Sequence, residues 1–170
     1  METNRLLGIS ACLMGKKVRY DGDHRQDTFI IDTLGKFVDF VPVCPEVECG
    51  LGVPREAMRL VGDQEDPRMV TIHTHIDHTE RMKAWACRQL AGITPLGLRG
   101  FIFKSNSPSC GLLGVDVYDE KGLPTEKGTG LFAREFINRF PQLPVIDEIG
   151  FQNRQFKECF IARIRFASET

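Results

Sequence analysis

Three short apolar runs stand out along the chain, and each is followed by polar or turn-forming residues. They span Leu6–Ala11, Phe37–Val43 and Gly100–Phe103. Runs of this length are typical of buried strands, and helix-like segments separate them, which favours an α/β fold with a mainly parallel sheet. We expect a three-layer, Rossmann-like arrangement in which residues 1–170 form a single domain.

The rest of the pattern predicts further helices and strands. Asp77 and Glu80 have the spacing of a capping box at the start of a helix, and Gly92 is a natural end for that helix. By the same criteria the chain has other helices near Arg25–Leu34, Thr129–Phe140 and Gln152–Phe166, and other strands at Val115–Tyr118 and Leu143–Ile146.

A cysteine lies just beyond each of the three apolar runs: Cys12, Cys49 and Cys110. The carboxyl ends of parallel strands meet at one rim of a sheet, where open α/β proteins bind their ligands. Three thiolates with an open fourth position suit a reactive metal or iron–sulfur centre better than a structural site, which normally has four protein ligands. We therefore expect these three thiols to share one crevice.

Composition limits the classes of function. The chain has 22 Lys and Arg residues against 23 Asp and Glu residues, a balance that argues against a long nucleic-acid partner. No run approaches the roughly 18 apolar residues of a membrane span, and Met1–Leu7 lacks a signal-peptide pattern. We expect a cytoplasmic protein, in which the six cysteines stay reduced and are available for metal binding or catalysis.

Three motifs in this order carry a family resemblance. They are Ser-Ala-Cys-Leu-Met-Gly at 10–15, Cys-Pro-Glu-Val-Glu-Cys-Gly-Leu-Gly-Val-Pro-Arg-Glu at 44–56, and Lys-Ser-Asn-Ser-Pro-Ser-Cys-Gly at 104–111. Together they resemble the thiouracil desulfidase family, once a domain of unknown function, and the resemblance covers nearly the whole chain. It implies a [4Fe–4S] cluster held by three cysteines and an enzyme that removes sulfur from a thiolated nucleobase such as 2-thiouracil.

The resemblance also implies roles for individual residues. Cys12, Cys49 and Cys110 match the cluster ligands, while Glu46 and Ser107 match the polar catalytic positions. The fourth iron would have no protein ligand, so it could accept a soft thiocarbonyl sulfur and polarise the carbon–sulfur bond for attack by water, without net redox change. Glu46 would act as the acid–base group, and Ser107 would orient the base or relay protons.

The other cysteines leave alternatives open. Cys44 lies beside Glu46 and can replace Cys49 as a ligand, or bind and relay sulfur, although the resemblance favours Cys49. Cys87 and Cys159 fall in apolar helical segments, where we expect buried thiols that act as small hydrophobic side chains.

Several polar features also have simpler interpretations. Glu46 can be an ordinary solvent-facing carboxylate of its loop, and we expect Ser105 and Ser109 to be turn formers that bond their own backbone. The remaining candidates for substrate or cluster contacts are cations that flank the motifs and two aromatic rings suited to stacking: Arg19, Arg25, Arg55, Lys104, Tyr20 and Phe132.

Two rival ligand sites come from other parts of the chain. His73, His75 and His78 have a spacing that can bind zinc, yet alternation along a strand and turn also places such side chains in water. Zinc can also occupy three thiolates in air. The sequence Gly-Thr-Gly at 128–130 can hold an anion ahead of a helix, although a flexible loop is the simpler interpretation.

We interpret the chain as a [4Fe–4S]-dependent enzyme that converts a small thiolated base to its oxo form and releases sulfide. One alternative is a cluster-binding redox or iron sensor without catalysis. Another is desulfuration of thiouridine within transfer RNA, which the balanced charge disfavours.

Overall fold

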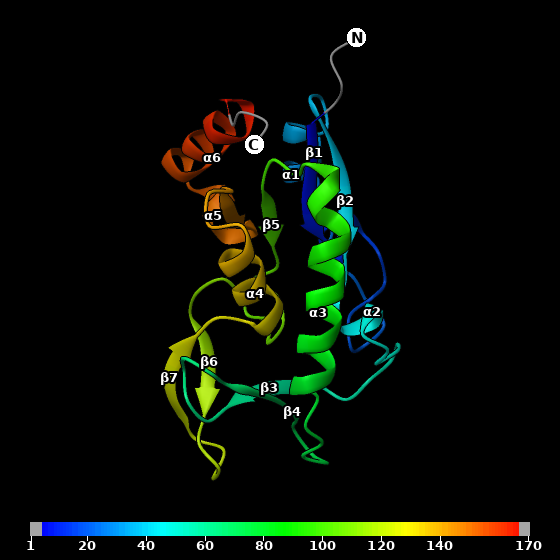
Figure 1. The fold of residues 1–170 in the computed structure, drawn as a ribbon, viewed down its shortest axis with the longest axis vertical. Coiled ribbons are helices and arrows are strands. Elements are labelled where there is room, and N and C mark those ends of the chain that lie inside the picture. Colours follow the sequence, from blue (N-terminus) through cyan, green and yellow to red (C-terminus); the bar gives the residue numbers. More distant parts are fainter. Residues whose placement is uncertain (1–4, 167–170) are drawn as a thin grey trace.

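The computed structural model of the protein describes residues 5–166; residues 1–4, which begin the Met1–Leu7 segment, and 167–170 lie outside the described part. Two four-stranded sheets organise the chain (Figure 1). The first is parallel, with the order β2-β1-β5-β8: β1 is Arg5–Ser10, β2 Val38–Val43, β5 Phe101–Phe103 and β8 Val145–Asp147. The second is mixed, with the order β4-β3-β6-β7: β3 is Met58–Val61, β4 Arg68–Thr71, β6 Val115–Tyr118 and β7 Pro124–Gly128.

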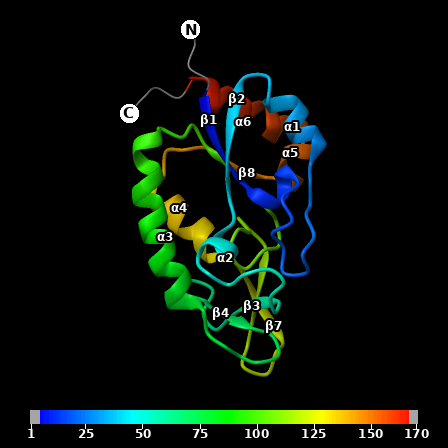
Figure 2. The ribbon, with the colours of Figure 1, turned by 90° about the vertical axis from the view of Figure 1, so that its right-hand side faces the viewer.

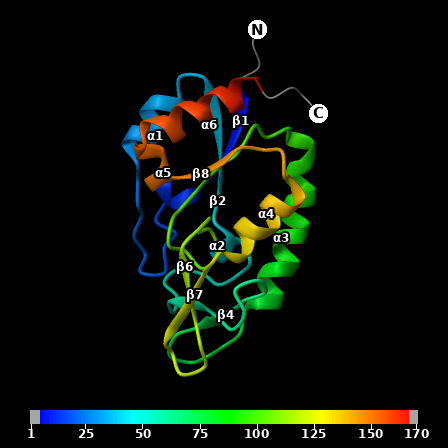
Figure 3. The same ribbon diagram turned by 90° about the vertical axis from the view of Figure 1, so that its left-hand side faces the viewer.

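Helices cover both faces of the parallel sheet (Figures 2 and 3). The longest helix, α3, runs from the mixed sheet along the parallel sheet (Figure 1). One face packs on α3 (Thr79–Ile93) and α4 (Leu131–Arg139), and the other on α1 (Thr28–Leu34), α5 (Glu148–Gln152) and α6 (Arg154–Phe166). The remaining helical segments are short: η1 (Ala11–Met14), α2 (Pro45–Glu48) and η2 (Thr94–Leu96).

Alternating side chains of β1 and β5 separate the two core layers. Phe101 and Phe103 face α3 and α4, whereas Ile102 between them faces the opposite layer. Gly8 of β1 is required here, because an added Cβ would lie 2.2 Å from a ring carbon of Phe101. The aromatic layer therefore fixes how β1 and β5 lie side by side, and with them the positions of the loops that follow.

The predicted strand positions of the parallel sheet are confirmed, but the prediction of one sheet is incomplete. Strands β3, β4 and β7 escaped the sequence pattern because they are short and partly exposed; β7, for example, is exposed over four of its five residues. The expected terminal helix is interrupted at Asn153, which has extended backbone after α5. None of the helices within residues 5–166 is long and apolar enough to span a membrane.

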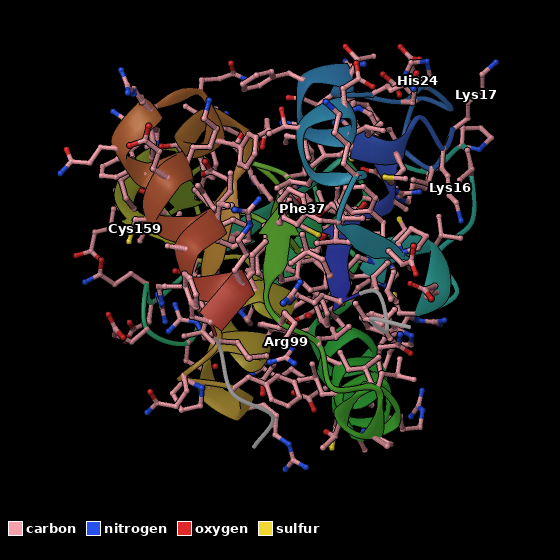
Figure 4. All side chains as sticks on the ribbon, turned by 90° about the horizontal axis from the view of Figure 1, so that it is seen from above. Lys16, Lys17, His24, Phe37, Arg99 and Cys159 are labelled. Carbon is pink, nitrogen blue, oxygen red and sulfur yellow. The ribbon has the colours of Figure 1, made fainter. Side chains whose placement is uncertain are left out.

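The predicted helix to about Gly92 is confirmed to within one residue, but its capping residue and the burial of the outer cysteines were predicted wrongly. His78, not Asp77, is the N-cap residue and makes no side-chain capping bond, although the Asp77 carboxylate accepts a bond from the Thr79 amide. The helix passes Gly92, ends at Ile93 and continues as η2. Cys87 and Cys159 are exposed, and Cys159 lies at the outer edge of the molecule (Figure 4).

Candidate active site

A cavity of about 370 Å³ lies where the carboxyl ends of β1, β2 and β5 approach the segment that leads into β3. Its walls come from five stretches, which contribute Ser10–Cys12, Val18–Tyr20 with Arg25, Val43–Glu46, Arg55 with Ala57 and Met58, and Lys104–Cys110. Helix α2, which follows β2, lies at this junction of the two sheets (Figure 2). The position agrees with the ligand-binding rim expected of parallel strands.

Cys12, Cys44 and Cys110 line this cavity, one after each of β1, β2 and β5. Each of the three thiols influences the other two electrostatically, so they are mutual neighbours. Burial raises the pKa of Cys12 to about 11, with Lys104 and Arg19 opposing the rise, and burial also raises the pKa of Cys44 and of Cys110. Three thiols that resist ionisation on their own become good ligands when a cationic centre stabilises the thiolates.

Cys49 does not line the cavity. It is 9% exposed and packs in the apolar layer formed with α3 and α4, where its Sγ lies 3.4 Å from the Glu46 carbonyl oxygen. The reason is local: Cys44 is the N-cap of the one-turn helix α2 and Cys49 its C-cap. Five helical residues correspond to about 500°, which is about 140° away from the starting direction, so the two side chains diverge. Cys44 therefore lines the cavity with Cys12 and Cys110, while Cys49 lies behind the cavity wall, within electrostatic reach of Cys44.

No group of three or more His, Cys, Asp or Glu side chains in residues 5–166 gathers closely enough to bind a single metal ion. His73, His75 and His78 thus form no zinc site, and the same finding argues against one zinc ion shared by the three cavity thiols. In a cubane cluster each thiolate binds a different iron, so its ligands need not converge on one point. The wider, three-thiol arrangement suits a cluster better than a single ion.

Glu46 is a buried carboxylate on the cavity wall, with 9% of the residue exposed. Its Oε2 accepts a hydrogen bond of 2.8 Å from Nε of Arg55, and its Oε1 accepts one of 2.9 Å from the Ser109 hydroxyl. Arg55 is fixed in turn because it also donates to the carbonyl oxygens of Gly52 and Val18. The solvent-facing interpretation of Glu46 is therefore wrong, and Arg55 is the cation that pairs with it.

A chain of hydroxyl groups leads to Glu46. Ser107 Oγ lies 3.0 Å from Ser109 Oγ and also accepts hydrogen bonds from the amides of Ser109 and Cys110. Since Ser109 gives its only hydroxyl proton to Glu46, it must accept from Ser107. The order of donation is thus Ser107 to Ser109 to Glu46. The turn former is Ser107, and the expectation that Ser109 bonds only its own backbone is wrong.

Ser105 also departs from the expectation of a simple turn former. Its hydroxyl donates to Glu148 at 2.6 Å and its amide donates to the other oxygen of the same carboxylate at 2.8 Å. Lys104 completes this buried group through an ion pair with Glu148. Burial alone would raise the pKa of Glu148, but the bonds from Lys104 and Ser105 outweigh it and lower the pKa.

The N-terminus of α4 holds the loop that carries Cys110. The amides of Gly130, Leu131 and Phe132 donate to carbonyl oxygens of Gly111, Pro108 and Ser109. A Cβ at Gly130 would lie 2.6 Å from the Ser109 carbonyl carbon, so glycine is needed for this close approach. These amides are occupied by the protein itself, which excludes both the anion site and the flexible loop predicted at 128–130.

The candidate substrate contacts separate into two groups. Arg19, Tyr20, Arg25 and Lys104 line the cavity, as does Arg55. Phe132 does not; it is fully buried between Trp85 and Phe101, so the prediction of a stacking surface there is wrong. The sequence alone did not distinguish this core ring from Tyr20, because the burial of Phe132 depends on contacts with rings distant in the chain.

Two buried thiols, a half-buried third and a hydrogen-bonded carboxylate at the rim of a parallel sheet define a metal- or cluster-binding enzyme site of an α/β protein. The chain belongs to the 2-thiouracil desulfurase family, whose model matches residues 7–148. The uncharacterized protein YbbK of Bacillus subtilis (strain 168) is 32% identical over 112 residues, which are 61% of this chain and 71% of that protein. The structure of the [4Fe-4S]-dependent thiouracil desulfidase TudS is similar over 94% of this chain and 99% of its own, with a TM-score of 0.69 and 27% identity.

Proposed function

We propose that this chain is a [4Fe–4S]-dependent desulfidase that converts a thiolated nucleobase such as 2-thiouracil to uracil and releases sulfide. The observation that carries the proposal is the cavity itself, which three thiols from the segments after three parallel strands line together with a hydrogen-bonded carboxylate. Similarity to TudS, which depends on such a cluster, supports the choice of cofactor. The reaction balances as thiouracil plus water giving uracil plus hydrogen sulfide, with no electron donor or acceptor.

We propose Cys12, Cys44 and Cys110 as the cluster ligands. Their mutual proximity and their burial fit a group that carries positive charge of its own, whereas Cys49 faces the apolar layer. When bound, such a cluster supplies one iron without a protein ligand, which acts as a Lewis acid toward the thiocarbonyl sulfur. Cys49 then has a packing role next to α2, and it serves as the natural control for Cys44.

The protein's own groups manage the proton. Glu46 is the proposed acceptor for the proton of the attacking water, because it is the carboxylate that lines the cavity beside the thiols. Arg55 and Ser109 hold its two oxygens in place. Ser107 and Ser109 form a path along which a proton can be relayed to or from the substrate by small hydroxyl rotations. Ser107 thus combines the proposed relay with its part in the turn before Cys110.

The same proposal includes the setting of the site. A single Rossmann-like domain over residues 1–170 is supported by the helices on both faces of the parallel sheet and by the family match at 7–148. A cytoplasmic location is supported by six cysteines that are free in the structure. A small thiolated base rather than RNA is supported by the cavity volume of about 370 Å³ and by the balanced charge of the chain.

Anaerobic reconstitution with iron and sulfide, followed by incubation with 2-thiouracil, tests the proposed function. We expect about four irons per chain, and uracil and sulfide released in equal amounts, with no turnover by the apo protein. A protein that binds the cluster but forms no uracil would contradict the enzyme proposal and favour the sensor alternative. A protein that binds no cluster would contradict the ligand proposal.

A further inference from the structure

Four cationic side chains line the cavity, and three of them already have hydrogen-bond partners in the protein. Of those that line the cavity, Arg55 is bound to Glu46 and to two carbonyl oxygens. Lys104 is bound to Glu148 and Ser105. The Arg25 side chain is 46% exposed and donates to Asp23 and to the His24 carbonyl.

Arg19 differs from these cations. Its Nε is buried and has no hydrogen-bond partner among the described residues. The nearest carboxylate oxygen, on Asp21, lies 4.0 Å away, beyond hydrogen-bond distance, and the arginine side chain is only 22% exposed. A buried donor without an acceptor is costly, so such a group in a cavity wall points to a ligand that supplies the acceptor.

The backbone holds Arg19 in position before any ligand binds. The Arg19 amide donates to Asp23 and its carbonyl accepts from Gly22, which closes a turn, and the Arg55 amide donates to the carbonyl of Tyr20. The guanidinium carbon lies 5.7 Å from the centre of the Tyr20 ring, in cation–π range. The turn and the ring together restrict the guanidinium, which lowers the entropy that ligand binding would cost.

The Arg19 side chain lines the same cavity as the three thiols of Cys12, Cys44 and Cys110. A base that presents its sulfur toward Cys12, Cys44 and Cys110 would therefore have the guanidinium within electrostatic reach of its ring. We infer that Arg19 binds the second exocyclic group of that ring, a carbonyl oxygen, and so selects oxo-thiopyrimidines over thio-bases that lack this oxygen. The inference rests on the proposed function for the identity of the ring. Arginine suits this task because it always carries charge and presents several donors in one plane.

The selectivity follows from hydrogen-bond energetics. A site built to bond a ligand oxygen rejects an analogue without it, because the buried donor is then left unpaired. Loss of a hydrogen bond from a charged donor is expected to weaken binding by about 10- to 100-fold. The effect should be confined to ligands that carry the oxygen.

The test compares two product-like bases, uracil and 2-hydroxypyrimidine, which lacks the 4-oxygen. Their dissociation constants are measured anaerobically by calorimetry on cluster-loaded wild-type protein, on Arg19→Met and on the matched control Arg25→Met. We expect Arg19→Met to weaken uracil binding by about 10- to 100-fold, while 2-hydroxypyrimidine changes by less than about 3-fold. Arg25→Met should change both by less than about 3-fold, because its guanidinium is exposed and already paired. Iron content and the visible spectrum should be unchanged in both variants.

Three results would overturn the inference: equal binding of the two bases by the wild-type protein, equal weakening of both bases in Arg19→Met, or loss of iron in that variant. The last would mean that Arg19 compensates the charge of the thiolates instead of binding the ring. Sulfide release from 2-thiouracil is recorded in parallel. If Arg19→Met weakens uracil binding but the wild-type protein releases no sulfide, the proposed function is contradicted and this inference is not. If the wild-type protein and Arg19→Met release sulfide equally well, this inference is contradicted and the proposed function is not.

Discussion

The parallel sheet and the mixed sheet contribute differently to the same cavity. The parallel sheet supplies the thiols, each from the loop directly after a buried strand. The mixed sheet contributes through the segment that enters β3, where Arg55 reaches across to Glu46. The thiols are thus placed by their own strands, whereas the carboxylate is oriented by Arg55, nine residues further along the chain, and by Ser109, 63 residues further along.

This difference separates two properties of the site. Under the proposed function, the strand ends and the loop before Cys110 hold the cluster, while the bonds that orient Glu46 determine the rate of turnover. Substitutions in the two groups should therefore have distinct signatures, one in iron content and the other in rate at constant iron content.

The largest expected effect is that of Glu46→Gln. It removes the proposed proton acceptor but keeps the shape of the side chain, so kcat should fall by about 10²- to 10⁴-fold at unchanged iron content. The matched control is Glu48→Gln on the same short helix, where the carboxylate is exposed and bonds only the Cys44 amide among the described residues. Normal turnover by Glu46→Gln, or an equal loss in Glu48→Gln, would contradict the acid–base role.

The paired serine variants should have the next largest effect. Ser109→Ala removes one of the two groups that hold Glu46 and breaks the hydroxyl chain, so kcat should fall by about 10- to 100-fold with iron retained. Ser107→Ala also leaves the amides of Ser109 and Cys110 without their acceptor, so it should lower iron retention as well. Single-turnover kinetics and iron analysis of both variants measure the two effects. The hydroxyl chain would be irrelevant if both variants reacted at the wild-type rate.

Gly130→Ala probes the contact that holds the Cys110 loop. Its new Cβ would meet the Ser109 carbonyl carbon at 2.6 Å, and the required shift should cost about 1–3 kcal/mol of stability and reduce iron retention. Gly92→Ala is the control, since it lies within α3 and nothing is within 4 Å of the added Cβ. It should stabilise the fold by about 0.5–1 kcal/mol. Equal denaturant midpoints for the two variants would refute the role of the close contact.

The smallest expected effect concerns Glu148, and it depends on pH. Because the folded state lowers the pKa of Glu148, its contribution to stability is present above the unfolded value, near pH 4.3, and is lost as the pH falls through the lower folded value. Glu148→Gln should therefore destabilise the protein by about 1 kcal/mol at pH 7. The difference from wild type should shrink at acid pH. A difference that grows on acidification would show the opposite sign of linkage.

Much of the parallel sheet could be predicted because its strands are continuous apolar runs that end in turn-forming residues. The mixed sheet could not, since half-exposed strands such as β7 have no such run. Within the site, proximity to a strand end identified Cys12 and Cys110. Which of Cys44 and Cys49 lines the cavity could not be predicted, because it depends on the helical turn between them; the proposed choice of Cys44 as a ligand rests on that turn.

The serines show the same limit at shorter range. Ser105, Ser107 and Ser109 alternate in one loop, and the sequence assigned the chemistry to Ser107 alone. In the structure Ser105 contacts Glu148 and Ser109 contacts Glu46. Both carboxylates lie more than 40 residues away, at sequence separations of 43 and 63, so no local pattern could reveal these bonds.

Cys44→Ala and Cys49→Ala test the central claim most directly, because the two residues lie five positions apart at the two ends of one helical turn. Both variants are reconstituted anaerobically, and iron content, the visible spectrum and sulfide release from 2-thiouracil are measured. We predict that Cys44→Ala fails to retain the cluster and releases no sulfide, whereas Cys49→Ala binds about four irons and remains active. A cluster retained in Cys44→Ala and lost in Cys49→Ala would contradict the account.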